Sequence, residues 1–455
     1  MKKNKNYKFL RYQKRRERKR LTRLRTRGYF KHFYTPEYKE VKFKKDHDDI
    51  ILGKHTFELE DFLNKNGNST IKKPTTEITI PKTFSLEEDY DSTIEILALI
   101  RKSLIKYKGE DIKIDFSNCI KVDFSSLFLL KVLLDEYLEN SKRLDQKVLI
   151  YKVIPNIIIT HSKNSDVNLK LLANKLIPIT SMGTSDFIPI SSLDMITGTR
   201  SQRHYAENKK GVAATKIRKY INTGLNRHNF SLNEKGDSFL DGMISEILNN
   251  AEDHSPFNKW YAFANLFETK RNQQNTEVVG EINLAFLNFG YSIFEGFEET
   301  KIQNKKTYNE MDALHRMVSE TLKGKKYSKE NLFTLYALQE GNSRLKFEEE
   351  SRGTGTMKFI NSFLNLGDYQ DELKGYVPHL LIYSGSTMLK CDNKYQPFSL
   401  DGAFYLSLND ENDMTHAPES SHLKTLDNRF PGTLLIGKIY LNESHLKKKI
   451  VDNGN

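Results

Sequence analysis

Residues 238–253 read SFLDGMISEILNNAED, and their apolar side chains recur at the 3.6-residue spacing of an amphipathic helix. Glu246 and Asn250 are four residues apart, so both point from one flank of the apolar stripe. Ser238, with Asp241 three residues later, predicts the start of the helix. The stretch therefore predicts a core helix that carries a carboxylate and a carboxamide one turn apart. The apolar stripe consists of Leu240, Met243, Ile244, Ile247, Leu248 and Ala251.

Glycine-containing turns follow this helix at three places. An apolar strand pattern at 281–287 runs into NFGYSI at 288–293, which predicts a strand that ends in a tight turn. The triplet GTG at 353–355 precedes an apolar helix pattern, and paired glycines at a helix start let backbone N–H groups approach phosphate oxygens. The pair GT at 432–433 opens the last strand pattern. Each motif alone is weak because turns need glycine anyway. Their order and their distances behind the helix are much more specific than any one of them alone.

In order and spacing these motifs resemble the ATP-binding domain of the GHKL superfamily, the Bergerat fold. That superfamily includes gyrase, histidine kinases, mismatch-repair ATPases and anti-sigma-factor serine kinases. The resemblance covers residues 190–445. It predicts an α+β sandwich of helices over a predominantly antiparallel sheet. The matching residues are Glu246, Asn250, Asn288, Gly290, Ile293, Gly353, Thr354, Gly355 and Thr433.

The resemblance implies ATP and Mg²⁺ as cofactors and gives roles to these residues. Glu246 would be the general base for a water or a Ser/Thr hydroxyl, and Asn250 the Mg²⁺ ligand. The triplet 353–355 would begin the helix under the phosphates, and Thr433 would lie near adenine. The segment 300–352 would be the lid over ATP. The activity implied is ATP hydrolysis or phosphoryl transfer to a Ser/Thr of a partner.

Two positions depart from the family pattern. The family usually has Asp where this chain has Asn288, and that carboxylate accepts a hydrogen bond from the adenine amino group. A carboxamide oxygen can still accept this bond, but the charge is lost. Ser292 replaces the second usual glycine, and its Cβ could crowd the nucleotide or change the turn. These departures favour binding over fast turnover and leave a purely sensory ATP site open.

Within the GHKL-like region, we expect helices over 212–225 and 238–253 and a charged helical stretch over 307–340. Expected strands cover 260–267, 281–290, 379–386, 402–408 and 432–441.

Strand and helix patterns alternate earlier in the chain, which predicts an α/β domain over 77–185. We expect helices over 91–108 and 125–140, and strands over 111–118 and 147–154.

The stretch IDFSNCIKVDFSSLFLLKVLLDEYL (114–138) is similar to the strand–turn–helix core of STAS domains, as in anti-sigma-factor antagonists. The fold class is thus α/β and α+β, a STAS-like domain followed by a GHKL sandwich. The resemblance implies a phosphorylated serine at Ser125. The alternative is that Ser125 or Ser126 is only the N-cap of the following helix.

The basic charge of the chain is concentrated at its start. Residues 1–36 hold 15 of the 71 basic and one of the 59 acidic residues, so the tail carries +14 and the remainder −2. Interleaved Tyr and Phe suit nucleic acid, with a solubilising tail or anionic lipid as alternatives. A polar connecting segment over 37–76 and a C-terminal tail over 446–455 complete the organisation.

The apolar pattern and the cysteines indicate where in the cell the protein is expected. There is no apolar run of 18 residues and no signal-peptide pattern, so we expect no membrane span. Cys119 and Cys391 stand far apart in Cys-free surroundings, which argues against a disulfide framework and favours a cytoplasmic location.

The sequence therefore predicts a cytoplasmic, bacterial, Mg·ATP-binding signalling protein. Its expected partner is another protein, STAS-like or a regulatory factor, and homodimer formation is left open. The rival prediction is a catalytically silent scaffold, or a nucleic-acid-binding protein that acts through residues 1–36. With STAS-like and GHKL-like units in one chain, we also hypothesise a switch in which the nucleotide alters the contact between them.

Overall fold

The computed structural model describes parts of the chain between residues 73 and 442. The basic tail 1–36 and most of the connecting segment lie outside the described residues, as does the C-terminal tail. Among the described residues, no helix has the length and apolarity to cross a membrane. The described ranges are 73–107, 110–145, 156–178, 190–199, 209–227, 231–254, 259–272, 275–321, 323–342, 357, 360–361, 363–364, 377–400 and 403–442.

A three-stranded parallel sheet begins the described fold, in the order β1 (Glu77–Thr79), β3 (Ile112–Asp115) and β5 (Ile157–Thr160). Ile112 and Ile114 are fully buried between half-buried polar neighbours, as the alternating pattern predicts. The predicted alternation of strands and helices is present. The connecting elements are α4 (Tyr90–Lys106), α5 (Phe124–Asp145), α6 (Ser165–Ala173) and the short parallel pair β2 (Thr83–Phe84) and β4 (Lys121–Val122).

The strand expected over 147–154 lies outside the described residues, and β5 follows it at 157–160. Cys119 and Cys391 are both free and buried.

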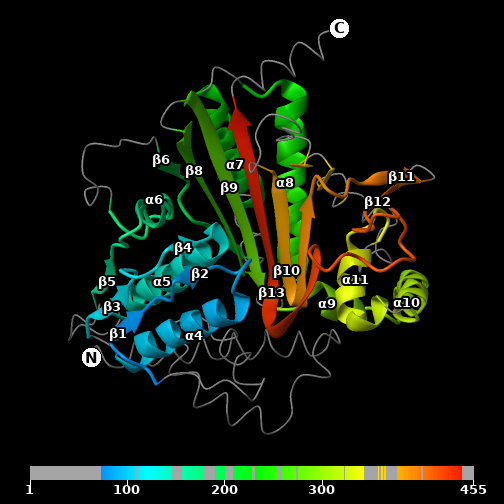
Figure 1. The fold of residues 1–455 in the computed structure, drawn as a ribbon, viewed down its shortest axis with the longest axis horizontal. Helices are drawn as coiled ribbons and strands as arrows, with labels where there is room; N and C mark the ends of the chain where they lie inside the picture. Colours follow the sequence, from blue (N-terminus) through cyan, green and yellow to red (C-terminus); the bar gives the residue numbers. More distant parts are fainter. Residues whose placement is uncertain are drawn as a thin grey trace, which may run out of the picture. The chain divides into compact units, whose positions relative to one another are not determined.

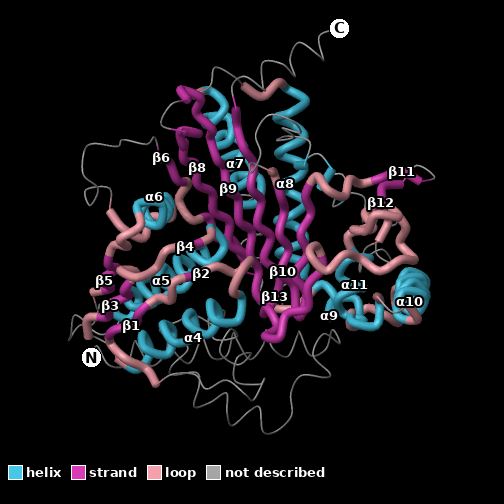
Figure 2. Tube along the Cα trace, viewed as in Figure 1, coloured by secondary structure: helices cyan, strands magenta, loops and turns pink. Residues whose placement is uncertain are grey.

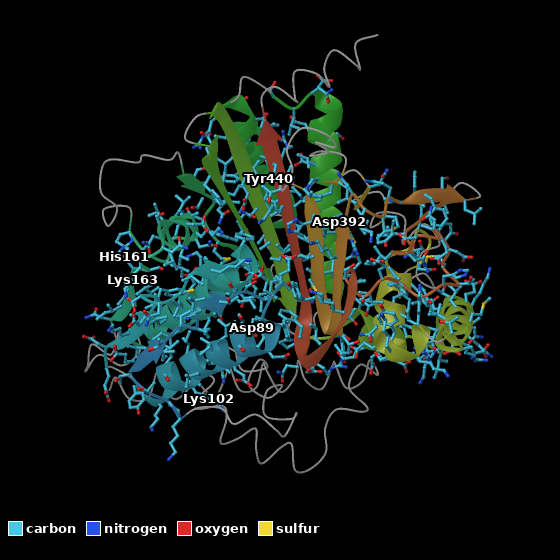
Figure 3. All side chains as sticks on the ribbon, in the orientation of Figure 1. Asp89, Lys102, His161, Lys163, Asp392 and Tyr440 are labelled. Atoms are coloured by element: carbon cyan, nitrogen blue, oxygen red, sulfur yellow. The ribbon has the colours of Figure 1, made fainter. Side chains whose placement is uncertain are left out.

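An antiparallel sheet of six strands forms the centre of the remaining chain (Figure 2). Its order is β10-β13-β9-β8-β6, and β7 also pairs with β8. The predicted antiparallel sheet is thus confirmed, with longer strands than expected. The strands are β6 (Ile190–Ser192), β7 (Ile196–Thr199), β8 (Lys259–Asn272), β9 (Asn275–Phe289), β10 (His379–Asp392) and β13 (Leu423–Asn442).

Helices α7 (Lys209–Asn226) and α8 (Glu234–His254) cover one face of this sheet (Figure 1). Side chains alternate between the faces along each strand, so Leu284 and Phe286 of β9 share a face. Both belong to the same core as Leu248 of α8 and Ile217 of α7. The apolar stripe predicted from 238–253 therefore does face the core.

Helix α8 begins at Glu234, one turn before the start predicted at Ser238. The backbone N–H of Asp237 already donates to Asn233 O at 2.9 Å. Arg218 of α7 forms ion pairs with Asp237 at 2.6 Å and with Asp241 at 2.9 Å. This cation from another helix holds the acidic first turns in place, so Ser238 lies inside the helix rather than at its cap.

The other face of the large sheet is covered by the N-terminal α/β unit. Phe124 of α5 stacks on Phe263 of β8, with ring centroids 6.0 Å apart. Tyr261 of β8 donates its hydroxyl to Glu136 Oε1 at 2.9 Å. Tyr90 of α4 stacks on Tyr383 of β10. Both faces of the sheet are therefore buried, one by helices α7 and α8 and the other by α4 and α5.

Short elements lie beyond β10 (Figure 1). The charged helical stretch expected over 307–340 is divided into three helices, 305–319, 324–326 and 329–337. Gly324 lies after the first break, where a Cβ would meet Val318 O at 1.8 Å. The strand expected over 402–408 shrinks to β12, which pairs only with β11 and stays outside the large sheet. The elements are α9 (Ile293–Glu299), α10 (Lys305–Ser319), η3 (Gly324–Lys326), α11 (Lys329–Ala337), β11 (Phe398–Leu400) and β12 (Ala403–Tyr405).

Candidate functional site

A row of side chains crosses four neighbouring strands at one end of the large sheet. Asn288 of β9 is paired with Thr433 of β13 and with Trp260 of β8, and Thr433 is paired with Ser384 of β10. By strand alternation these residues share the face of Phe286, which is the face covered by α7 and α8. Asn288 and Thr433, predicted from motifs far apart in the sequence, are therefore brought together.

Asn288 has an unpartnered polar group in the interior. Asn288 is 3 % exposed, and its Nδ2 is buried without a hydrogen-bond partner among the described residues. Leaving a buried donor unsatisfied costs about 1–3 kcal/mol, so native proteins rarely keep one without a reason. A ligand that offers an acceptor would remove this cost.

Thr433 and Ser384 present a pair of hydroxyls beside this amide. Their oxygens lie 3.0 Å apart. Ser384 Oγ donates to Gly432 O at 3.2 Å and accepts from the backbone N–H of Ile293 at 2.9 Å. Because the proton of Ser384 is used in this way, Thr433 is the donor to Ser384. Ser384 was not predicted, because it lies in no motif.

Two glycines allow the turn after β9 to approach β13 closely. Gly432 has φ +121°, and a Cβ there would meet Asn288 O at 2.1 Å. Gly290 has φ +137°, and its N–H donates to Pro431 O at 3.4 Å. Both conformations favour glycine strongly. The tight turn expected at Gly290 is present, and β9 ends there.

Helix α9 begins at Ile293, with Ser292 as its N-cap. Ser292 Oγ accepts from the N–H of Glu295 at 3.1 Å, and Glu295 Oε2 accepts from the N–H of Ser292 at 2.8 Å. This capping box explains why a serine suits the position where the resemblance expects glycine. The Ser292 Cβ faces Gly385 (φ +56°), where an added Cβ would lie 2.9 Å from it.

A buried ionic cluster next to this turn was not predicted. Glu330 of α11 is 7 % exposed and accepts hydrogen bonds from Ser386 Oγ at 2.7 Å and from Arg429 Nη1. Arg429 Nη2 also donates to Glu295 Oε1 at 2.9 Å. The cluster links α9, α11, β10 and β13, so it fixes the corner of the sheet where the row lies. Its members are far apart in the sequence and follow no spacing that could reveal them.

Glu246 and Asn250 lie on α8, in the layer that covers the same face of the sheet as Asn288. Both are partly exposed, and neither side chain hydrogen-bonds to another described residue. Leu248 and Ala251 between and beside them are buried in the helix-side core. The pair therefore stands at the border of that core, on the flank of the apolar stripe, as predicted.

The triplet Gly353, Thr354 and Gly355 lies outside the described residues. Met357 and Ile360, which follow it, are fully buried in the helix-side core with α8. A Cβ added to Gly437 of β13 would meet the ring of Phe363 at 2.6 Å, so this segment packs against the sheet.

No metal centre is preformed in the described part of the chain: no group of three or more His, Cys, Asp or Glu there could hold an ion. A Mg²⁺ ion held by Asn250 would take its other ligands from water and phosphate oxygens, as Mg²⁺ usually does at nucleotide sites.

Ser125 lies at the start of α5 and is 2 % exposed. The N-cap is neither serine: Asp123 Oδ1 accepts from the N–H of Ser126 at 2.7 Å and from Ser125 Oγ at 2.8 Å. The alternative that Ser125 or Ser126 caps the helix is therefore wrong, since the longer carboxylate one residue before the helix reaches the free N–H groups. A phosphoacceptor role for Ser125 would require its exposure.

No protein-family model, no curated protein and no solved structure matches the chain.

Proposed function

We propose that the chain is a Mg·ATP-binding regulatory protein of the GHKL type with a STAS-like N-terminal unit, and that it acts in cytoplasmic signalling. The observation that carries this proposal is the buried Nδ2 of Asn288, which has no hydrogen-bond partner among the described residues and lies beside the hydroxyl pair of Thr433 and Ser384. An isolated donor on an apolar face fits the edge of a base, which offers acceptors in the plane of a flat, apolar ring.

The other proposed residues fit the phosphate end. Asn250 has a hard carboxamide oxygen for Mg²⁺, and Glu246 has a carboxylate that can take the proton of an attacking water or hydroxyl. Bound Mg·ATP would supply a phosphoryl group whose charge the metal neutralises. One helical turn between the two side chains directs them to the same region.

The contact between the sheet and the N-terminal unit supports a regulatory role. Tyr383, which stacks on Tyr90, is the chain neighbour of Ser384 and points to the opposite face of β10. A ligand that shifts Ser384 would therefore act on the packing of α4. This is the route by which the nucleotide would influence the N-terminal unit or a separate protein partner.

Calorimetry on the full chain tests the proposal. We expect ATP to bind in the presence of Mg²⁺ and to bind more weakly when EDTA is added. Asn250→Ala should remove this dependence on Mg²⁺, whereas Ser245→Ala, on the same helix, should behave as wild type. The absence of ATP binding at millimolar concentration, or equal binding with and without EDTA in the wild type, would contradict the proposal.

A further inference from the structure

The amide of Asn288 differs from a carboxylate in what it can recognise. A carboxylate only accepts hydrogen bonds, whereas a carboxamide has one accepting and one donating end. This difference matters here because the residue is buried and its Nδ2 has no hydrogen-bond partner in the part of the chain that the structure describes. The following inference rests on the proposed function and concerns which base the site takes.

No described neighbour of Asn288 accepts a hydrogen bond from its Nδ2. Thr433 and Ser384 hydrogen-bond to each other, and Trp260 on the other side carries only a donor, its indole N–H. Nδ2 has no hydrogen-bond partner among the described residues, so no bond there holds the donor end of the amide in place. A bound ligand would then decide which end of the amide faces which of its atoms.

Adenine and 6-oxopurines carry opposite hydrogen-bonding patterns at position 6 and N1 of their Watson–Crick edges. Adenine presents a donor at its 6-amino group and an acceptor at N1, whereas a 6-oxopurine presents an acceptor at O6 and a donor at N1. A carboxamide pairs with either pattern through two hydrogen bonds after a half-turn. A carboxylate pairs with the adenine amino group and opposes the O6 of a 6-oxopurine with like partial charge.

We propose that this site binds 6-oxopurine nucleotides as well as ATP, and that Asn288 is the residue that permits it. The site then senses the purine nucleotide pool rather than ATP alone. Asn288 in place of the Asp that the resemblance expects would then change which purines the site accepts, rather than only weaken the contact with adenine.

Inosine triphosphate is the probe that isolates this effect, because it differs from ATP only at the 6-position and N1. Calorimetry on the full chain with Mg²⁺ should give dissociation constants for ATP and inosine triphosphate within about tenfold of each other, a difference of about one unit in log Kd. In Asn288→Asp the same ratio should rise by at least about 100-fold in favour of ATP, because a buried acceptor then faces O6.

The outcomes separate the two proposals. If ATP binds and inosine triphosphate binds more than about 100-fold more weakly to the wild type, the inference is wrong and the proposed function survives. If neither ligand binds, the proposed function itself fails. Circular dichroism checks that Asn288→Asp folds, and if it does not, the wild-type ratio decides the question alone.

Discussion

Tyr90 of α4 and Tyr383 of β10 stack with ring centroids 6.0 Å apart and planes inclined by 11°. The pair joins the N-terminal unit to the large sheet directly behind Ser384. Asn428 Nδ2 donates to Asp91 Oδ1 at 2.6 Å, and Lys390 pairs with Glu87 at 3.1 Å. The two units thus share one interface of rings bordered by polar contacts.

This contact yields a prediction about stability. Tyr90→Ala removes a buried ring and should lower the free energy of unfolding by about 3 kcal/mol. The Tyr90 hydroxyl is buried without a hydrogen-bond partner among the described residues, so Tyr90→Phe should be neutral or slightly stabilising. Urea denaturation of both variants measures the difference. Equal stability of Tyr90→Ala and wild type would show that the stack does not form.

The Arg429–Glu330 pair yields a second prediction. Arg429→Met leaves Glu330, with a side chain only 8 % exposed, without its cation, and should cost about 3 kcal/mol. Arg316→Met removes a comparable pair with Asp312, but Arg316 is 75 % exposed, so the cost should stay below about 1 kcal/mol.

Adding Glu330→Gln to Arg429→Met should recover part of the lost stability, because the uncompensated buried charge disappears. Thermal and urea unfolding should be measured for the wild type, Arg429→Met, Arg316→Met and the double variant. A double variant less stable than Arg429→Met would contradict this account of the cluster.

Asp115 gives a prediction about pH. The hydroxyl of Thr160 and the backbone N–H of Ser117, which donates at 3.0 Å, hold the pKa of Asp115 at about 2, below its ordinary value of 3.8. A depressed carboxyl pKa contributes stability that is complete above the unfolded value and is lost as the pH falls. The loss should therefore occur between about pH 4 and pH 2.

Thr160→Val removes the hydroxyl of β5 that donates a hydrogen bond to Asp115, and so tests whether this bond lowers the pKa of Asp115. In that variant the pKa of Asp115 should move towards its ordinary value, and the acid-dependent loss of stability should be smaller. Unfolding measured across pH 2–5 in both proteins tests this. An unchanged slope would mean that Asp115 does not join β3 to β5 in this way.

The sequence predicts those parts of the fold that depend on local periodicity. The apolar stripe of α8 and the strand that ends at Gly290 are present because one buried face imposes its period on the residues. The start of α8 was misplaced because Arg218, on another helix, holds its first turns. The reach of β13 back to Leu423 was not predicted, since Pro431 and Gly432 look like a strand entry rather than a bend within a strand.

In the candidate site, too, some residues could be predicted from local motifs, but their arrangement could not. Asn288 and Thr433 were predicted from their motifs, but their place in one row depends on the register between β9 and β13. Ser384 joins the row only because β10 pairs on the other side of β13. Glu330 and Arg429 belong to no pattern, because they lie on α11 and β13 and meet only in the folded chain. A hairpin register is fixed by its turn, but the register between strands as far apart in the sequence as β9 and β13 cannot be read from local spacing.

A substitution at Glu246 distinguishes the proposed enzyme from a catalytically silent scaffold. Glu246→Gln keeps the shape of the side chain but removes its ability to take a proton. If Glu246 is the general base, ATP affinity should stay within about threefold, while the rate of ATP hydrolysis or phosphoryl transfer falls by about 10²–10⁴. Glu234→Gln, at the exposed start of the same helix, is the matched control and should leave both unchanged. Unchanged turnover in Glu246→Gln would show that another group is the base. No turnover in the wild type, with the phenotype kept in Glu246→Gln, would favour the scaffold or the tail-dependent nucleic-acid binder instead, because a protein that works by binding alone has no use for a base at that position.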